Sequence, residues 1–175
     1  MKKGFTILEV ILAITILTLA VGGSFVLVSR AIASVSVAQS KLIASYLAQE
    51  GIEIVKNIRD TNWLTPGKDW AEELEEGTYE VNYEDYLNLR LDTCDPPCDY
   101  DNNLSFLKIN GEFYNYDPDG EDTKFKRRIT ISNREDLDGD EEIDRLKVLV
   151  EVFWQDRGRI YPPAIAQEYL YDWKP

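Results

Sequence analysis

The chain has 175 residues and a formal net charge of −13, with 32 acidic residues against 19 basic ones. An acidic chain of this kind is repelled by nucleic acid and by anionic lipid, so nucleic acid is not a default partner. With no histidine and only two cysteines, it lacks the usual base and nucleophile of catalysis, and we expect a protein that is not an enzyme. The length suits one domain with a modest core.

The N-terminal part of the sequence is apolar and long enough to cross a membrane. Val10 to Ser29 carry no charge, and at about 1.5 Å rise per residue a helix of that length spans roughly 30 Å, the thickness of the hydrocarbon core. Lys2 and Lys3 precede the run and Arg30 follows it. This arrangement predicts a single pass through the cytoplasmic membrane, with a cytoplasmic N-terminus and an exported remainder.

Glu9 is an unusual residue at the start of such a run. A carboxylate inside a membrane segment costs a few kcal/mol and normally faces a partner or marks a function. Cleavage between Gly4 and Phe5 would create an amino terminus four residues before this acid. The two groups do not neutralise each other comfortably within one chain, but the amino terminus of one subunit can meet Glu9 of a neighbour.

The stretch Lys3-Gly4-Phe5-Thr6-Ile7-Leu8-Glu9 resembles the class III signal of type IV pilins and of the pseudopilins of type II secretion. The resemblance implies cleavage after Gly4 by a prepilin peptidase and N-methyltransferase, with methylation of Phe5. It also implies that Phe5 and Glu9 dock the subunit onto other pilin or pseudopilin subunits at an inner-membrane assembly platform. The protein would then move from the cytoplasmic membrane into a cell-surface filament.

Two ordinary alternatives compete for the same N-terminus. A secretory signal peptide would end at Ala31-Ile32-Ala33, which fits the A-x-A pattern, and would leave Ser34 as the first residue. Its apolar core usually has about 7–15 residues, whereas the core here is longer and begins with an acid. A plain signal anchor suits the length but has no use for Gly4, Phe5 or Glu9.

Helical spacing continues after Arg30. The apolar residues that follow it are Ala44, Leu47, Ala48, Gly51, Ile54, Val55 and Ile58. No proline interrupts Phe5 to Thr65, so we expect one helix of about 55 residues that ends near Thr61-Asn62 and Pro66-Gly67. Gly22-Gly23 is its weak point, where we expect either a bend or local melting, or else close packing of small residues between membrane helices.

The rest of the chain changes from helical to strand periodicity. Trp63 and Trp70 are expected to cover the core rather than to form a ligand cage, and Asp69 to Glu76 to form a short acidic helix ended by Gly77. Alternation with a period of two then predicts strands. The candidate strands are Thr78 to Tyr83, Phe106 to Ile109, Glu112 to Tyr116, Phe125 to Ser132 and Leu146 to Trp154.

Turn residues connect these strands. Asn110-Gly111 predicts a hairpin, and Asp156-Arg157-Gly158 turns the chain into a last strand, in which Pro162-Pro163 must lie at an edge or a bulge. A long N-terminal helix, transmembrane in its first half and packed on an antiparallel β-sheet head, is an α+β design and matches the pilin-like fold. The expected parts are a leader peptide (1–4), a transmembrane and assembly helix (5–29), its amphipathic continuation (30–62) and a globular β-rich head (63–175).

The late hairpin carries a second, looser resemblance. Trp154-Gln155-Asp156 and Tyr171-Asp172-Trp173 look like the corresponding segments of PilV-type minor pilins. This resemblance implies a minor subunit of a pilus.

The only two cysteines, Cys94 and Cys98, are separated by Asp95-Pro96-Pro97, which can turn the chain back on itself. In an exported chain a disulfide is the expected state, and it would shape a loop rather than hold the fold. Two free thiols are the alternative. A metal pair lacks other soft ligands, because the chain has no histidine.

The acidic segment 136–144 is a candidate Ca²⁺ site. Its carboxylates surround Gly139 at a spacing that a tight loop can fold onto a hard cation. The candidate ligands are Asp136, Asp138, Asp140 and Asp144. The segment departs from the EF-hand order, with glycine at the fourth position and no glutamate at the twelfth. A solvated turn without metal is the equal alternative, and no cofactor is required by the rest of the sequence.

One basic cluster interrupts the acidic composition. It consists of Lys124, Lys126, Arg127 and Arg128. The cluster is expected to be a strand face that balances nearby acids, and contact with DNA, an anionic polymer or a neighbouring acidic head is the alternative.

These observations predict a non-enzymatic minor pilin or pseudopilin that is drawn from the membrane into a filament through its N-terminal helix. A type II secretion pseudopilin is the alternative within the family. A membrane-anchored, calcium-dependent binding or adhesion protein that never polymerises is the alternative of another class, and only a polymerising subunit needs Glu9.

Overall fold

The structure is a computed structural model that describes residues 4, 6–81, 92–94, 98–111 and 113–172. One helix, α1 (Ile7–Leu64), precedes a series of antiparallel strands. The strands are β1 (Gly77–Glu80), β2 (Asp92–Thr93), β3 (Lys108–Asn110), β4 (Phe113–Asn115), β5 (Glu121–Asp122), β6 (Phe125–Glu135), β7 (Arg145–Asp156) and β8 (Arg159–Tyr171). They form a five-stranded sheet in the order β2-β1-β6-β7-β8 and a three-stranded sheet in the order β4-β3-β5. The expected α+β architecture is confirmed.

The chain divides into two compact units, Met1–Ser40 and Lys41–Pro175. In the first unit α1 is continuous through Gly22 and Gly23, so no local melting occurs there. By length and composition α1 can cross a membrane: an 18-residue window has a mean hydropathy of 2.5, and none of that window is buried within the protein. The hydroxyl of Thr18 donates a hydrogen bond to the Ile14 carbonyl at 2.9 Å, which satisfies a polar group inside the apolar segment.

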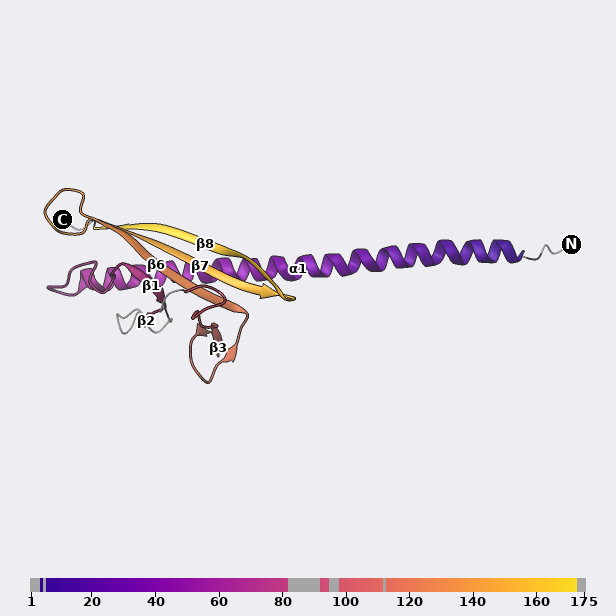
Figure 1. Ribbon diagram of the computed structural model, residues 1–175, viewed down its shortest axis with the longest axis horizontal. Helices are drawn as coiled ribbons and strands as arrows, with labels where there is room; N and C mark the ends of the chain where they lie inside the picture. Colours follow the sequence, from indigo (N-terminus) through magenta and orange to yellow (C-terminus); the bar gives the residue numbers. More distant parts are fainter. Residues whose placement is uncertain (1–3, 5, 82–91, 95–97, 112, 173–175) are drawn as a thin grey trace. The chain divides into compact units, whose positions relative to one another are not determined.

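In the second unit the C-terminal part of α1 packs on the large sheet, and β6, β7 and β8 run along it (Figure 1). The stripe that helical spacing predicts is the buried one. Its members include Ala44, Leu47, Ala48, Val55 and Ile58. A residue larger than glycine does not fit at position 51 without a shift of its neighbours, since a Cβ built there would lie 2.8 Å from Val150 Cγ1 of β7. The absence of a side chain at Gly51 therefore lets the helix and the sheet approach each other closely at this point.

The sheet buries alternate residues of its central strands. The inward residues of β7 are Leu146, Val148, Val150, Val152 and Trp154. Arg157 and Gly158 take positive φ angles of 51° and 78° between the paired residues Asp156 and Arg159, so the predicted turn is confirmed. Pro162-Pro163 lies in β8, the edge strand, where the register with β7 shifts. The two prolines therefore lie both in an edge strand and at an irregularity of the pairing, which are the two positions that the sequence predicts for them.

The prediction of a helix over Asp69 to Glu76 is wrong. This segment forms hydrogen-bonded turns, with the N–H of Glu72 on the Asp69 carbonyl at 3.1 Å, and Gly77 opens β1 instead of ending a helix. The reason is tertiary: the side-chain amide of Asn62 donates to the carbonyls of Trp70 and Glu72, at 3.3 and 2.7 Å. Those carbonyls are then held toward α1 instead of along a helix axis of their own.

The early strands also differ from their expected bounds. β1 ends at Glu80, and residues 82 and 83 of the predicted strand lie outside the described part of the chain. The hairpin at Asn110-Gly111 is present, but Asn110 pairs with Phe113, so it closes β3 and the turn begins at Gly111, whose φ is 67°. The strand expected from Phe106 begins at Lys108. Glu112 lies outside the described residues.

Candidate functional site

Thr6 and Glu9 form the N-terminal cap of α1. The backbone N–H of Glu9 donates to Thr6 Oγ1 at 3.3 Å and to the Thr6 carbonyl at 3.1 Å. Thr6 thus occupies the N-cap and Glu9 the third helical position, the spacing of a capping box. The Glu9 carboxylate also lies at the positive end of the helix dipole, and its side chain is exposed. Sequence analysis considered Glu9 for docking only and missed the role of Thr6, which the Thr-x-x-Glu spacing signals.

Gly4 lies ahead of the helix and is exposed. A Cβ built on it would meet nothing within 4 Å, so packing within the chain does not require glycine at this position. Phe5 lies outside the described residues. We therefore expect that a molecule that binds this segment, and not packing within the chain, requires glycine at position 4.

The acidic loop between β6 and β7 is wrapped around its own carboxylates. Asp136 accepts hydrogen bonds from the N–H groups of Gly139 and Glu141, at 2.6 and 2.9 Å. The ligand oxygens of Asp136, Asp138 and Asp144 all lie within 4.8 Å of one another. Among the described residues Asp140 is not part of this group; it accepts instead from the N–H of Glu142 at 2.9 Å. The structure thus gathers three of the four candidate Ca²⁺ ligands.

The electrostatics of this loop differ from one carboxylate to the next. The N–H groups of Gly139 and Glu141 lower the pKa of Asp136 because they stabilise its charged form. The pKa of Asp138 is raised: the N–H of Asp140 acts in the opposite direction, but repulsion from the carboxylates of Asp140 and Asp144, with partial desolvation, outweighs it. A bound cation would relieve this repulsion.

Cys94 and Cys98 are joined by a disulfide, with their Cα atoms 6.1 Å apart. Both cysteines are buried in a small apolar cluster with Leu104, against which Phe153 packs. The guanidinium of Arg128 donates to the Cys98 carbonyl at 2.6 Å, so the small loop is held to β6. Asp95-Pro96-Pro97 lies outside the described residues.

Residues 1–25 match a family model described as the prokaryotic N-terminal methylation motif. The chain carries a class III prepilin signal. No curated protein and no solved structure matches the sequence. The match covers the leader, the cap at Thr6 and Glu9, and the first turns of α1, which are the residues that carried the resemblance.

The prepilin signal gives a reason for the exposed apolar surface of α1. Proteins with this signal are structural subunits that a prepilin peptidase processes and that assemble with other pilins. The apolar helix that follows the signal supports membrane anchoring of the precursor. A surface of this size must be covered by lipid or by other helices.

Lys126 and Arg127 of the basic cluster belong to the packed interior of the head and not to a solvated strand face. Arg127 is fully buried and donates to the carbonyls of Val81 and Leu47, at 2.7 and 3.3 Å. Lys126 is buried as well and donates to the Tyr100 carbonyl at 2.7 Å. Arg128 meets Glu151 at 2.6 Å, a pair that fits the expected balance with nearby acids. The cations of Lys126 and Arg127 are therefore withdrawn from contact with anionic polymers.

Trp63, in the last turn of α1, and Trp70, which follows the helix, cover the core, as expected. Trp70 is buried, and its indole N–H donates to the Ile143 carbonyl at 2.6 Å. Trp63 is partly buried against the same core, and its indole N–H donates to Asp172 Oδ1 at 3.2 Å. Both rings also line a pocket at this end of the helix.

Proposed function

We propose that this chain is a minor pilin or pseudopilin, cleaved after Gly4, N-methylated at Phe5 and assembled by its N-terminal helix into a type IV pilus-like filament. The observation that carries the proposal is the prepilin signal directly ahead of an uncovered apolar helix with an exposed acid, Glu9, in its first turn. The precursor waits in the cytoplasmic membrane with its N-terminus inside and its head exported, and the assembly machinery then draws it into a surface filament.

The specific form that we propose is a PilV-type minor pilin, with a type II secretion pseudopilin as the alternative. The late hairpin supports the first, although Trp154 is also explained by packing, since it is buried and stacks on Tyr161 at 5.8 Å. The neighbouring genes discriminate between the two. A pilus assembly ATPase with further minor pilins supports the pilus, and secretion core components support the pseudopilus.

Processing tests the proposal directly. We expect the mature protein to begin at N-methyl-Phe5 and to retain all of α1, because a prepilin peptidase cuts ahead of the apolar segment and not behind it. Intact-mass analysis of the purified protein measures this. Gly4→Val should block cleavage completely, whereas Gly4→Ala tests whether a small side chain is tolerated. A mature start at Ser34 would show an ordinary signal peptide instead.

We further propose that the acidic loop binds Ca²⁺ through Asp136, Asp138 and Asp144. The proposal rests on their mutual approach within 4.8 Å and on the Coulomb repulsion within the loop. Carboxylate oxygens at this spacing suit a cation that accepts six to eight oxygen ligands, and the smaller Mg²⁺ is a poorer match for a flexible loop. In a chain that does not polymerise, the same loop would serve calcium-dependent binding or adhesion.

Thermal unfolding tests the calcium site. Binding at a hundredfold excess over Kd stabilises the folded protein by about 2.7 kcal/mol, which raises Tm by about 5 °C or more in a chain of this size. The measurement is a melting curve of the full-length protein in detergent, with millimolar Ca²⁺ or equal Mg²⁺. Asp138→Asn should abolish the shift. Asp140→Asn should preserve it, and equal loss in both variants would contradict the three-residue site.

A further inference from the structure

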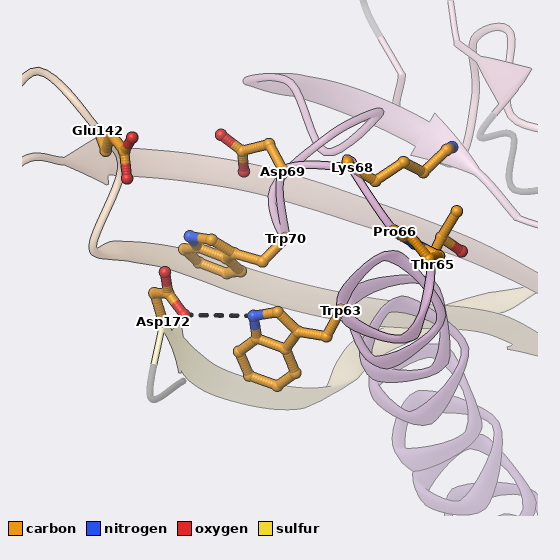
Figure 2. Close-up of a pocket in the computed structure, with 9 residues that line it drawn as sticks. Trp63, Thr65, Pro66, Lys68, Asp69, Trp70, Glu142 and Asp172 are labelled. Atoms are coloured by element: carbon orange, nitrogen blue, oxygen red, sulfur yellow. Dashed lines mark hydrogen bonds between the residues drawn. The ribbon is translucent and has the colours of Figure 1, made fainter. Parts of the chain in front are cut away.

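A pocket of about 520 Å³ opens at the C-terminal end of α1 (Figure 2). Three segments that are far apart in the sequence line it: residues 63–70, Glu142 from the loop before β7, and Asp172, which directly follows β8. All of them belong to the unit that holds the sheet. Among the described residues, α1 contributes only Trp63 of its last turn to the lining and the prepilin signal contributes none, so the pocket is separate from the site of processing.

Two indoles form the aromatic part of the lining. The rings of Trp63 and Trp70 lie 6.1 Å apart between centroids and are tilted by 30°. Both indole N–H groups already donate within the protein, to Asp172 Oδ1 and to the Ile143 carbonyl. Because Trp70 is buried, the π surface that the lining offers to a ligand is mainly that of the partly buried Trp63. The guanidinium of Arg59 lies over the Trp63 ring, 4.6 Å from its centroid, so one face of this indole is already occupied by a cation.

The polar part of the lining is negative. Asp69, Glu142 and Asp172 contribute carboxylates, and Lys68, the one basic residue among the described residues of the lining, lies within ion-pair distance of Glu72 and Glu73, at 3.3 and 3.6 Å. The last turn of α1, which ends beside the pocket, has no basic residue. The partial negative charge of the helix C-terminus adds to that of the carboxylates.

We propose that this pocket binds an organic cation of the alkylammonium class. A quaternary ammonium or alkylated amine presents a positive charge covered by methyl groups, which suits aromatic faces next to carboxylates. A neutral sugar, another partner of tryptophan rings, is less favoured, because both indole donors are occupied and the net negative charge of the lining adds nothing to its binding. The site gives the head a recognition function in addition to its place in a filament.

Choline chloride is the probe, added to the full-length protein in an uncharged polyoxyethylene detergent with EDTA, so that the calcium loop contributes nothing. The readouts are tryptophan fluorescence, with equal NaCl as the ionic-strength control, and saturation transfer to the choline methyl protons. We expect saturable binding with a Kd on the order of millimolar. The uncharged isostere 3,3-dimethylbutan-1-ol should bind at least about tenfold more weakly, because the Coulomb attraction is removed.

Charge variants locate the site. Asp172→Asn keeps an oxygen acceptor for the Trp63 N–H while it removes a charge, and Glu142→Gln removes another; each should raise the Kd about tenfold. Glu141→Gln, a neighbouring acid outside the lining, should match the wild-type protein. Choline signals no larger than those of NaCl, equal binding of the isostere, preference for glucose, or an unchanged Kd in Asp172→Asn would each overturn the proposal.

Discussion

Glu9→Leu is expected to insert into the membrane and to be cleaved like the wild-type protein, but to be missing from filaments. Insertion should be at least as good because an acid that costs about 3 kcal/mol in a membrane segment is removed. The helix start should persist, since Thr6 Oγ1 accepts the backbone N–H of residue 9 and not its side chain. What disappears is the charge that meets the amino terminus of the next subunit in the proposed filament, and losing more than about 1.4 kcal/mol at that contact would lower incorporation more than about tenfold.

Immunoblots of sheared fibres and of the membrane fraction measure this effect. Glu9→Asp retains the charge but draws it back by one methylene, so its incorporation should be intermediate. Glu9→Gln separates charge from shape and should behave like Glu9→Leu. Wild-type amounts of Glu9→Leu in the fibres would remove the docking role and would favour a membrane protein that never polymerises.

Arg127→Ala should lower the free energy of unfolding by about 3 kcal/mol. The side chain is fully buried and ties three parts of the head together, the Leu47 carbonyl in α1, the Val81 carbonyl after β1 and β6 itself. Truncation leaves a cavity and deprives buried carbonyls of charged donors, and each effect costs between about 1 and 3 kcal/mol. The nearby Glu50, 3.4 Å from Arg127, is partly exposed and contributes less.

Denaturant unfolding of the full-length protein, followed by tryptophan fluorescence, measures this cost. All four tryptophans lie beyond residue 62, so the signal reports the head and not the membrane segment. Glu50→Gln should cost less than about 1 kcal/mol. Arg127→Met, which preserves much of the volume, should be milder than Arg127→Ala. A cost in Glu50→Gln equal to that in Arg127→Ala would show that the ion pair, and not burial, stabilises this contact.

Regular patterns were the most predictable part of the fold. The helical stripe of α1, the alternation of β7 and the Arg157-Gly158 turn follow from periodicity and local backbone preference, and they appear where the sequence places them. The failure at Asp69 to Glu76 has another origin. Asn62 lies several residues upstream and captures carbonyls that a local helix would need, and no local pattern contains such a contact.

The basic cluster shows the same limit for candidate sites. Four cations in five residues are typical of a solvated surface, yet β6 alternates, and alternation alone places Arg127 on the inward face with Phe125 and Ile129. This alternation could have identified Arg127 as a buried residue, but the prediction gave more weight to the charge of the cluster. The prepilin signal could be predicted because its residues are consecutive in the sequence. The pocket could not be predicted, because residues 63–70 of its lining are far in the sequence from Glu142 and Asp172.

Removal of the leader would leave the start of α1 as it is. The cap uses Thr6 and Glu9, and α1 begins at Ile7, so the hydrogen bonds of the first turn do not depend on residues 1–4. Only Phe5 separates the scissile bond from this cap. Cleavage therefore changes charge and not backbone: a new ammonium group arises beside a helix end that is itself positive. In the proposed filament, cleavage would therefore add a positive charge at the end of a helix that is already formed, and this charge would favour contact with an acid of a neighbouring subunit.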